Sequence, residues 1–173
     1  NEHTIYNVSH QITENLSDEA EVFIANHMKR EDVNYNNLEG KGVAKNRNNT
    51  LQFIEPSAIC LILDDDVQLC KNIFQTVIQA FNDNPTADFI SFKILDLESN
   101  DYKSYPKEKK WHTSRTLTEI GTTEMAFRSD LILHSDVRFD ERFGPGVEKY
   151  PLGEDFIFAM DLHHLKTKML FLP

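Results

Sequence analysis

The feature that most constrains the fold is a continuous apolar run from Ala58 to Leu63, followed at once by Asp64, Asp65 and Asp66. Such a short run, bounded by polar residues, is typical of a strand that is buried on both faces, as in the middle of a parallel sheet. It is far shorter than the roughly 20 residues that a membrane-spanning helix needs. The sequence therefore predicts an internal strand with three carboxylates at its carboxyl end.

The segments that follow this strand predict a strand–helix–strand unit. Ile73, Val77, Ile78 and Phe81 recur at helical spacing, and a turn signal at residues 82–85 ends that helix. Residues 88–94 then alternate in the manner of a second strand. This order of elements indicates an α/β fold.

The remaining pattern predicts a short strand at residues 5–9, a helix from residue 43 that ends before Pro56, a helix over about 154–165 and a last strand at 169–172. Residues 18–28 are compatible with a helix or a strand. Residues 34–42 and 96–118 predict loops, and a loop as long as the second is usually functional or disordered. The length of 173 residues suits a single domain over residues 1–173.

The charge balance narrows the class of ligand. The chain carries 18 basic and 28 acidic residues, a formal net charge of −10, which argues against nucleic acid as a partner. A small phosphorylated ligand remains compatible with this charge, because a divalent cation can lie between acidic protein and anionic ligand. The two cysteines, Cys60 and Cys70, are too few for a disulfide framework and lack a metal-ligand spacing.

The three aspartates are candidates for a cation site. Ligands of open α/β sheets bind at the carboxyl ends of strands, and adjacent carboxylates repel one another unless a cation or donors neutralise them. Mg²⁺ or Mn²⁺, which takes one or two carboxylates together with phosphate oxygens and water, suits such a group. The alternative is an acidic turn that stabilises the amino end of the next helix.

Two further segments carry candidate site residues. Residues 40–48 place glycines and the basic side chains of Lys41, Lys45 and Arg47 at a helix start, where an anion is favoured. The alternative there is a solvated surface helix. Glu154 and Asp155 open the late helix, and either could act as a general base, although acidic residues in a first turn also simply complement the helix dipole.

Taken together, the motifs resemble those of family 2 type glycosyltransferases with the GT-A fold, from about Gly40 to Pro173. They are Gly42–Asn48 (GVAKNRN), an apolar strand ending in Asp64–Asp66 (ILDDD), Glu124–Ile132 (EMAFRSDLI), Phe139–Gly144 (FDERFG) and Gly153–Asp155 (GED). The resemblance implies an α/β, Rossmann-like, mostly parallel sheet flanked by helices. The family's usual first strand has no counterpart at the amino end, so we expect a domain that lacks that strand.

The resemblance also implies roles for these residues. Asp66, together with Asp64, would hold Mg²⁺ or Mn²⁺ at the diphosphate of the donor. Asp64 or Asp65 would hold the ribose or complete the water shell of the metal. Arg47 and Lys45 would contact the nucleotide sugar. Asp155 and Glu154 would form the catalytic acidic pair, with Asp155 preferred as the base.

The implied reaction is metal-dependent transfer of a hexosyl or related glycosyl group from a nucleotide-sugar donor to a hydroxyl acceptor, with inversion. The implied donor is a UDP-sugar, and the acceptor is a saccharide or lipid-linked saccharide, as in polysaccharide biosynthesis. The implied location is the cytoplasm, or the inner membrane face without a transmembrane segment.

Two alternatives stay open at this point. One is a truncated or inactive transferase-like domain that acts as a binding module. The other is a metal-dependent phosphotransferase or nucleotidyltransferase, although Val67-Gln68 after the aspartates argues against the aspartyl-phosphate phosphatase version of this idea.

Overall fold

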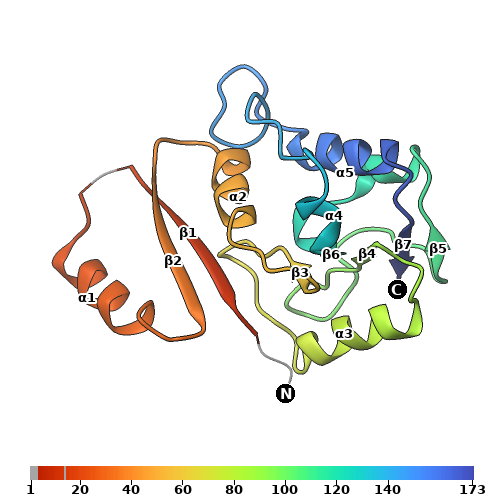
Figure 1. Ribbon diagram of the computed structural model, residues 1–173, viewed down its shortest axis with the longest axis horizontal. Coiled ribbons are helices and arrows are strands. Elements are labelled where there is room, and N and C mark those ends of the chain that lie inside the picture. The colour runs from red at the N-terminus through yellow and green to blue at the C-terminus, as the bar shows by residue number, and fades with distance from the viewer. Residues whose placement is uncertain (1–3, 14) are drawn as a thin grey trace. The chain divides into compact units, whose positions relative to one another are not determined.

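The computed structural model describes residues 4–13 and 15–173 (Figure 1). The chain forms two compact units. The first unit contains the chain up to Ile54 together with Arg138–Glu154, and the second contains Glu55–Val137 together with Asp155–Pro173. The prediction of one domain over residues 1–173 stays a prediction, because two compact units can belong to a single domain.

The first unit is built on two parallel strands, β1 (Tyr6–Ile12) and β2 (Val33–Glu39), which pair in register from Tyr6 opposite Val33 to Ile12 opposite Glu39 (Figure 1). Helix α1 (Asp18–His27) connects them, and the Ser17 hydroxyl accepts a hydrogen bond from the Ala20 N–H at its amino end. The segment that was compatible with a helix or a strand is therefore a helix, capped in the usual way by serine.

The prediction of a loop over residues 34–42 is wrong, because β2 occupies most of that segment. Asparagine is a poor strand former, yet here Asn34 donates from Nδ2 to Oδ1 of Asn7 on β1 at 2.9 Å. The parallel ladder satisfies the backbone of β2, while Asn34 and Asn37 leave their polar side chains exposed. Pairing with β1 thus overrides the local preference of the sequence.

The second unit contains a mixed five-stranded sheet in the order β3-β6-β4-β7-β5. Its strands are β3 (Ile59–Leu61), β4 (Phe89–Phe92), β5 (Lys110–Trp111), β6 (Met125–Arg128) and β7 (Met169–Leu172). Strands β3, β4 and β7 share one direction, and β6 and β5 run against them. The α/β class is confirmed, and the predicted strand–helix–strand unit is present as β3, α3 (Ile73–Asp83) and β4, with β6 inserted between its two strands.

The expectation that the run before the aspartates is an internal strand is wrong in one respect. Strand β3 has three residues, stands at the end of the strand order and is only half-buried. The fully buried strands are β4, β6 and β7, whose first three residues are all buried. An apolar run alone could not distinguish these positions, because half-buried edge strands are also apolar on one face.

Two helices cover the sheet of the second unit. Val77 and Phe81 of α3 pack in one core cluster with Ile90 of β4 and Leu170 of β7. Phe158 and Leu162 of α5 (Glu154–His164) are also fully buried, and the ring centroids of Phe158 and Phe127 lie 6.1 Å apart. Both helices were predicted from their apolar spacing, and no helix in the described residues is long and apolar enough to cross a bilayer.

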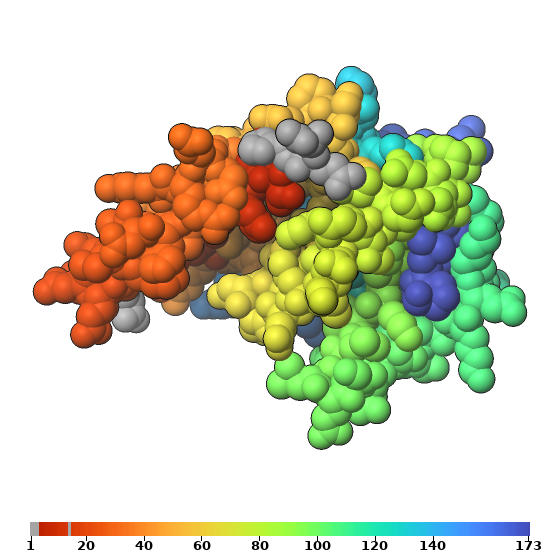
Figure 2. Space-filling model, turned by 90° about the horizontal axis from the view of Figure 1, so that it is seen from below, coloured from red at the N-terminus to blue at the C-terminus, as the bar shows by residue number. Residues whose placement is uncertain are grey.

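The long charged segment 96–118 contains regular structure and belongs to the second unit, and part of it forms the green projection in Figure 2. It contains β5, the bridge between Leu95 and Asp101, and a 3-10 turn at Thr116–Glu119. A second 3-10 turn at Thr122–Glu124 leads into β6, and the short helix α4 (Asp130–Leu133) follows β6.

His112 joins β5 to the centre of this sheet. Its imidazole nitrogens lie 2.8 Å from the Ser91 hydroxyl on β4 and 3.1 Å from the Thr116 hydroxyl. Burial, with smaller contributions from the nearby charges of His163 and Lys110, lowers the pKa of His112 from its ordinary value to about 4. The neutral ring therefore bridges two strands and a turn.

Because the pKa of His112 is lower in the folded chain than in the unfolded chain, the unfolded state binds more protons between about pH 6.5 and 4. We expect stability to be present above pH 6.5 and to fall as pH decreases through this window. The free energy of unfolding in urea should decrease between pH 7.5 and pH 4.5. This decrease should be larger in the wild type than in His112→Gln by about 1–2 kcal/mol, after allowance for solvent screening. Equal losses in the two proteins would contradict this account.

Candidate functional site

The three aspartates lie where the sequence predicts them, immediately beyond β3. The Ile62 N–H still donates to the Met125 carbonyl at 3.2 Å, and the chain then turns at Asp65 and Asp66. Asp64 is half-buried, whereas Asp65 and Asp66 are exposed. Because β3, β4 and β7 share one direction, this turn lies at the edge of the sheet formed by their carboxyl ends.

The turn offers carboxylate ligands to a cation that is also coordinated by phosphate or water. Among the described residues, no three His, Cys, Asp or Glu side chains gather closely enough to enclose a metal ion. Mg²⁺ and Mn²⁺ need no such cage when phosphate oxygens and water supply the rest of the coordination shell. One or two exposed carboxylates on a turn fit that requirement, and they do not fit an all-protein metal centre.

The sequence predicts an anion site at the amino end of helix α2 (Val43–Leu51), but that end is already occupied by protein. The Val43 N–H donates to the Pro145 carbonyl at 3.0 Å. Gly146 lies against Gly42 so closely that a Cβ on Gly146 would be 2.9 Å from the Gly42 nitrogen. The expected anion site at this helix start is therefore partly filled by the 145–146 backbone.

Lys45 also makes a contact within the protein. Its Nζ donates to the Glu39 carbonyl at 2.8 Å, at the end of β2. The ammonium group thus ties α2 to the strand that precedes it. Its predicted contact with a nucleotide sugar stays a prediction, and that contact would have to share the ammonium group with Glu39.

Arg47 and Glu154, predicted to be site residues from separate motifs, form a buried ion pair. Arg47 Nη1 lies 2.9 Å from Glu154 Oε1 across 107 residues of sequence, and the two side chains are 13% and 7% exposed. The guanidinium carbon lies 5.5 Å from the centroid of the Phe139 ring, within cation–π range. Glu154 is therefore a paired anion held in a water-poor environment.

Gly144 leaves the room that the Glu154 carboxylate occupies. A Cβ on Gly144 would lie 2.8 Å from both Cδ and Oε2 of Glu154, and the Gly144 backbone has a φ of +101°. Both the contact and the conformation exclude other residues at this position without a shift of the chain. The glycine of the FDERFG motif is thus explained by the glutamate of the GED motif.

Asn48 has a structural role that no pattern in the sequence indicates. Its Nδ2 donates to the Phe139 carbonyl and its Oδ1 accepts from the Phe139 N–H, both at 2.8 Å. Nδ2 also donates to Glu141 Oε1 at 3.0 Å. One amide side chain therefore holds the backbone of the 139–141 segment, and Asn48 stands beside Arg47 in the same motif.

Asp155 follows Glu154 and belongs to the second unit. It is half-buried, and its Oδ1 accepts a hydrogen bond from the Phe156 N–H at 2.7 Å in the first turn of α5. A carboxylate at this place is favoured by the positive end of the helix dipole. Of the two acids at the start of α5, Asp155 has the carboxylate that is not locked to an arginine in the first unit.

Glu124, one residue of the EMAFRSDLI motif, is the buried centre of a second polar cluster. Its Oε1 accepts from the Tyr105 hydroxyl at 2.8 Å and lies 2.6 Å from Lys103 Nζ, and its Oε2 accepts from the Gly121 N–H at 3.3 Å. The Tyr105 hydroxyl in turn accepts from the Ile94 N–H at 3.1 Å. The cluster lies in the second unit beside the start of β6, and it orders the long charged segment at the sheet's carboxyl edge.

Comparisons with known proteins bear on the fold. No family model matches the sequence, and a search of curated proteins finds no match. Two solved structures of the S. aureus glycosyltransferase TarS match the chain. The structure of TarS residues 1–349 has a TM-score of 0.72 and 19% identity over 98% of this chain. The other TarS structure has a TM-score of 0.65 and 21% identity over 90% of this chain.

This chain spans 49% of the first TarS chain and 27% of the second, so it corresponds to a part of those proteins. Identities of this size establish likeness of fold alone. The chain therefore has the fold of a fragment of TarS, an α/β fold with a sheet flanked by helices, and the family resemblance of its motifs implies this fold class.

The buried ion pair provides a test of the first unit. Glu154→Gln leaves the Arg47 charge without its buried partner, and we expect a loss of about 3–5 kcal/mol of unfolding free energy in urea. The matched control is Asp140→Asn, which breaks the exposed ion pair with Arg142 and should cost no more than about 1 kcal/mol. A cost for Glu154→Gln as small as that of the control would show that the pair does not hold this unit together.

Proposed function

We propose that the chain is the donor-binding part of a glycosyltransferase that moves a sugar from a nucleoside diphosphate to a hydroxyl acceptor. The observation that best supports this is the pairing of Arg47 with Glu154, which brings two of the transferase-like motifs together across 107 residues. The likeness of fold to TarS supports the same proposal independently of those motifs.

The proposed donor site includes the turn after β3. Asp66 and Asp64 are the proposed ligands of Mg²⁺ or Mn²⁺, with Asp65 or Asp64 at the ribose. When bound, the metal would stabilise the negative charge of the leaving nucleoside diphosphate. The exposure of Asp66 supports this assignment, because an exposed carboxylate leaves the remaining coordination positions of the metal to phosphate and water.

The proposed base is Asp155, and the geometry argues against Glu154. A proton taken up by Glu154 would break its buried ion pair with Arg47, which costs stability, whereas Asp155 is free of that constraint. A carboxylate that accepts the proton of an acceptor hydroxyl would raise its nucleophilicity. Direct displacement at the anomeric carbon would then invert its configuration.

The remaining assignments concern the substrate. Arg47 is proposed to contact the nucleotide, because a guanidinium can engage a carboxylate and an anionic ligand together. Lys45 is proposed as a supporting cation. The donor is proposed to be a UDP-sugar, and the acceptor a saccharide or lipid-linked saccharide.

The metal assignment is tested by isothermal titration calorimetry with UDP in the presence and absence of Mn²⁺. We expect binding that needs the metal and that weakens about tenfold or more in Asp66→Asn, since a charge-assisted contact contributes about 1.5–3 kcal/mol. Asp136→Asn, at an exposed aspartate of the same unit, is the control and should bind as the wild type does. Heat that is independent of Mn²⁺, or a variant that binds normally, would refute the assignment.

The assignment of the base is tested by the release of UDP from a panel of UDP-sugars. Asp155→Asn should lower turnover about 100-fold or more, while Mn²⁺-dependent UDP binding changes little, since the base acts on the acceptor. Asp161→Asn, an exposed aspartate farther along α5, is the control and should retain turnover. Retained turnover in Asp155→Asn would remove this residue from the mechanism.

A further inference from the structure

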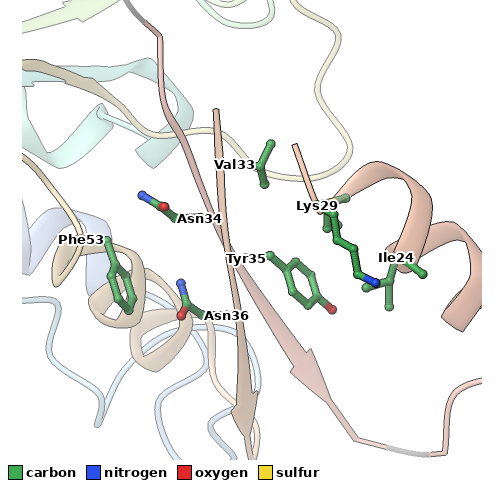
Figure 3. Close-up of a pocket in the computed structure, with 9 residues that line it drawn as sticks. Ile24, Lys29, Val33, Asn34, Tyr35, Asn36 and Phe53 are labelled. Atoms are coloured by element: carbon green, nitrogen blue, oxygen red, sulfur yellow. The ribbon is translucent and has the colours of Figure 1, made fainter. Parts of the chain in front are cut away.

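The first unit contains a cavity that the proposed function does not use. It has a volume of about 530 Å³ and lies between α1, β2 and the residue Phe53, which follows α2 (Figure 3). We call it the edge cavity. None of the residues predicted for the donor site lines it, so it needs a separate explanation.

The edge cavity runs along the side of β2 rather than over one face. Four consecutive residues of the strand, 33–36, line it. Successive side chains of a strand point to opposite faces, so a space that touches all four must border the strand's edge. In Figure 3, Val33 and Tyr35 point toward α1, and Asn34 and Asn36 point toward Phe53.

The hydrogen-bond pattern identifies which backbone groups face this edge. The Tyr6 N–H donates to the Asp32 carbonyl at 2.8 Å, so in the parallel ladder the groups of Asn34 and Asn36 also face β1. Those of Val33, Tyr35 and Asn37 then face away from β1. The Val33 N–H is satisfied by the Arg30 carbonyl at 3.1 Å.

Unpaired backbone groups therefore stand in a row along the edge. In the described part of the chain, the N–H and C=O of Tyr35 and the N–H of Asn37 have no hydrogen-bond partner in the protein. They repeat every second residue, about 6.6 Å apart. This is the spacing with which a further strand pairs, and a sugar or a nucleobase could not follow the whole row.

The two walls suit the alternating side chains of an added strand. On one side, Ile24 of α1 and Met28, which follows the helix, are only half-buried, and α1 has no buried residue at all among those described. On the other side, the Phe53 ring is 37% exposed. Lys29 supplies the sole charged side chain of the lining, so an acidic residue in the incoming strand would find a complementary partner.

We propose that the edge cavity binds an extended segment of a partner polypeptide, which adds to β2 as a third strand. The backbone of the segment pairs with Tyr35 and Asn37, its apolar side chains alternate between the α1 wall and Phe53, and an acidic residue lies at Lys29. A second copy of this chain is the less favourable occupant, because the net charge of −10 opposes self-association and β2 itself is rich in asparagine.

The test uses the full chain and a fluorescein-labelled heptapeptide, Thr-Val-Val-Val-Glu-Val-Thr, followed by fluorescence anisotropy. In an extended strand, its glutamate and one valine share the face toward α1 and Lys29, and its other three valines share the face toward Phe53. We expect saturable binding, together with slower hydrogen exchange at the Tyr35 and Asn37 amides. Two control peptides have the same side chains but are methylated on alternate backbone nitrogens, one on the odd and one on the even positions. Each lacks the N–H donors of one strand edge, and we expect at least one of the two to lose binding.

Two variants locate the binding. Asn37→Pro removes an outward N–H at an exposed edge position, where proline is tolerated, and should weaken binding about tenfold. Its matched control, Asn37→Ala, should bind normally. Ala25→Trp fills the cavity from an exposed position on α1 and should abolish binding, whereas Asn26→Trp, exposed and outside the lining, should not.

Three results would overturn the proposal. The first is an absence of saturable binding to the heptapeptide while the wild type remains folded. The second is equal binding by the unmodified peptide and both methylated peptides, or by Asn37→Pro and Asn37→Ala. The third is a wild-type dimer in light scattering that Asn37→Pro converts to a monomer, which would make a second copy of the chain the occupant.

Discussion

The ion pair between Arg47 and Glu154 is the constraint on which the first unit depends. The chain leaves this unit after residue 54, builds most of the second unit, and returns at residue 138 for one more segment. Closing so long an interval costs conformational entropy, and the returning segment has few apolar side chains to offset that cost. A buried pair, an aromatic ring beneath the guanidinium and the two-point contact of Asn48 with the Phe139 backbone supply the compensating interactions.

The motif residues fall into two groups, those that stabilise the first unit and those proposed to bind a ligand. Arg47 and Gly144 both contact Glu154, and Asn48 holds the Phe139 backbone, so the architecture of the first unit accounts for their presence in the sequence. Asp65 and Asp66, which follow β3, are exposed. Adjacent carboxylates at a strand end repel one another, and the metal proposed for these aspartates would offset that repulsion.

Much of the fold could be predicted from the sequence, because most of its elements bury a regular apolar pattern. The helices α3 and α5 and the strands β4 and β7 follow directly from that pattern. Strand β2 could not be predicted, since its asparagines favour turns until β1 offers a ladder of hydrogen bonds. The edge position of β3 also depends on pairing between strands that are distant in sequence.

The candidate site was predictable only in part, for a similar reason. Motif order placed Arg47 and Glu154 among the site residues, but no local signal indicated that they neutralise each other. Glu124 was hidden because its partners, Lys103 and Tyr105, lie in a segment without periodicity. Contacts between individual polar groups produce no periodic pattern in a sequence, whereas the packing of apolar faces does.

The interleaved course of the chain limits how this fold can be rearranged in evolution. The first unit is completed by α2 and the 138–154 segment, which are distant in sequence. A crossover between homologous genes within the intervening stretch would therefore take these two segments from different parents. Arginine and glutamate, or glycine and the carboxylate it accommodates, would then come from different parents. Viable recombinants should therefore exchange the whole Glu55–Val137 segment, so that the segments on both sides of it come from the same parent.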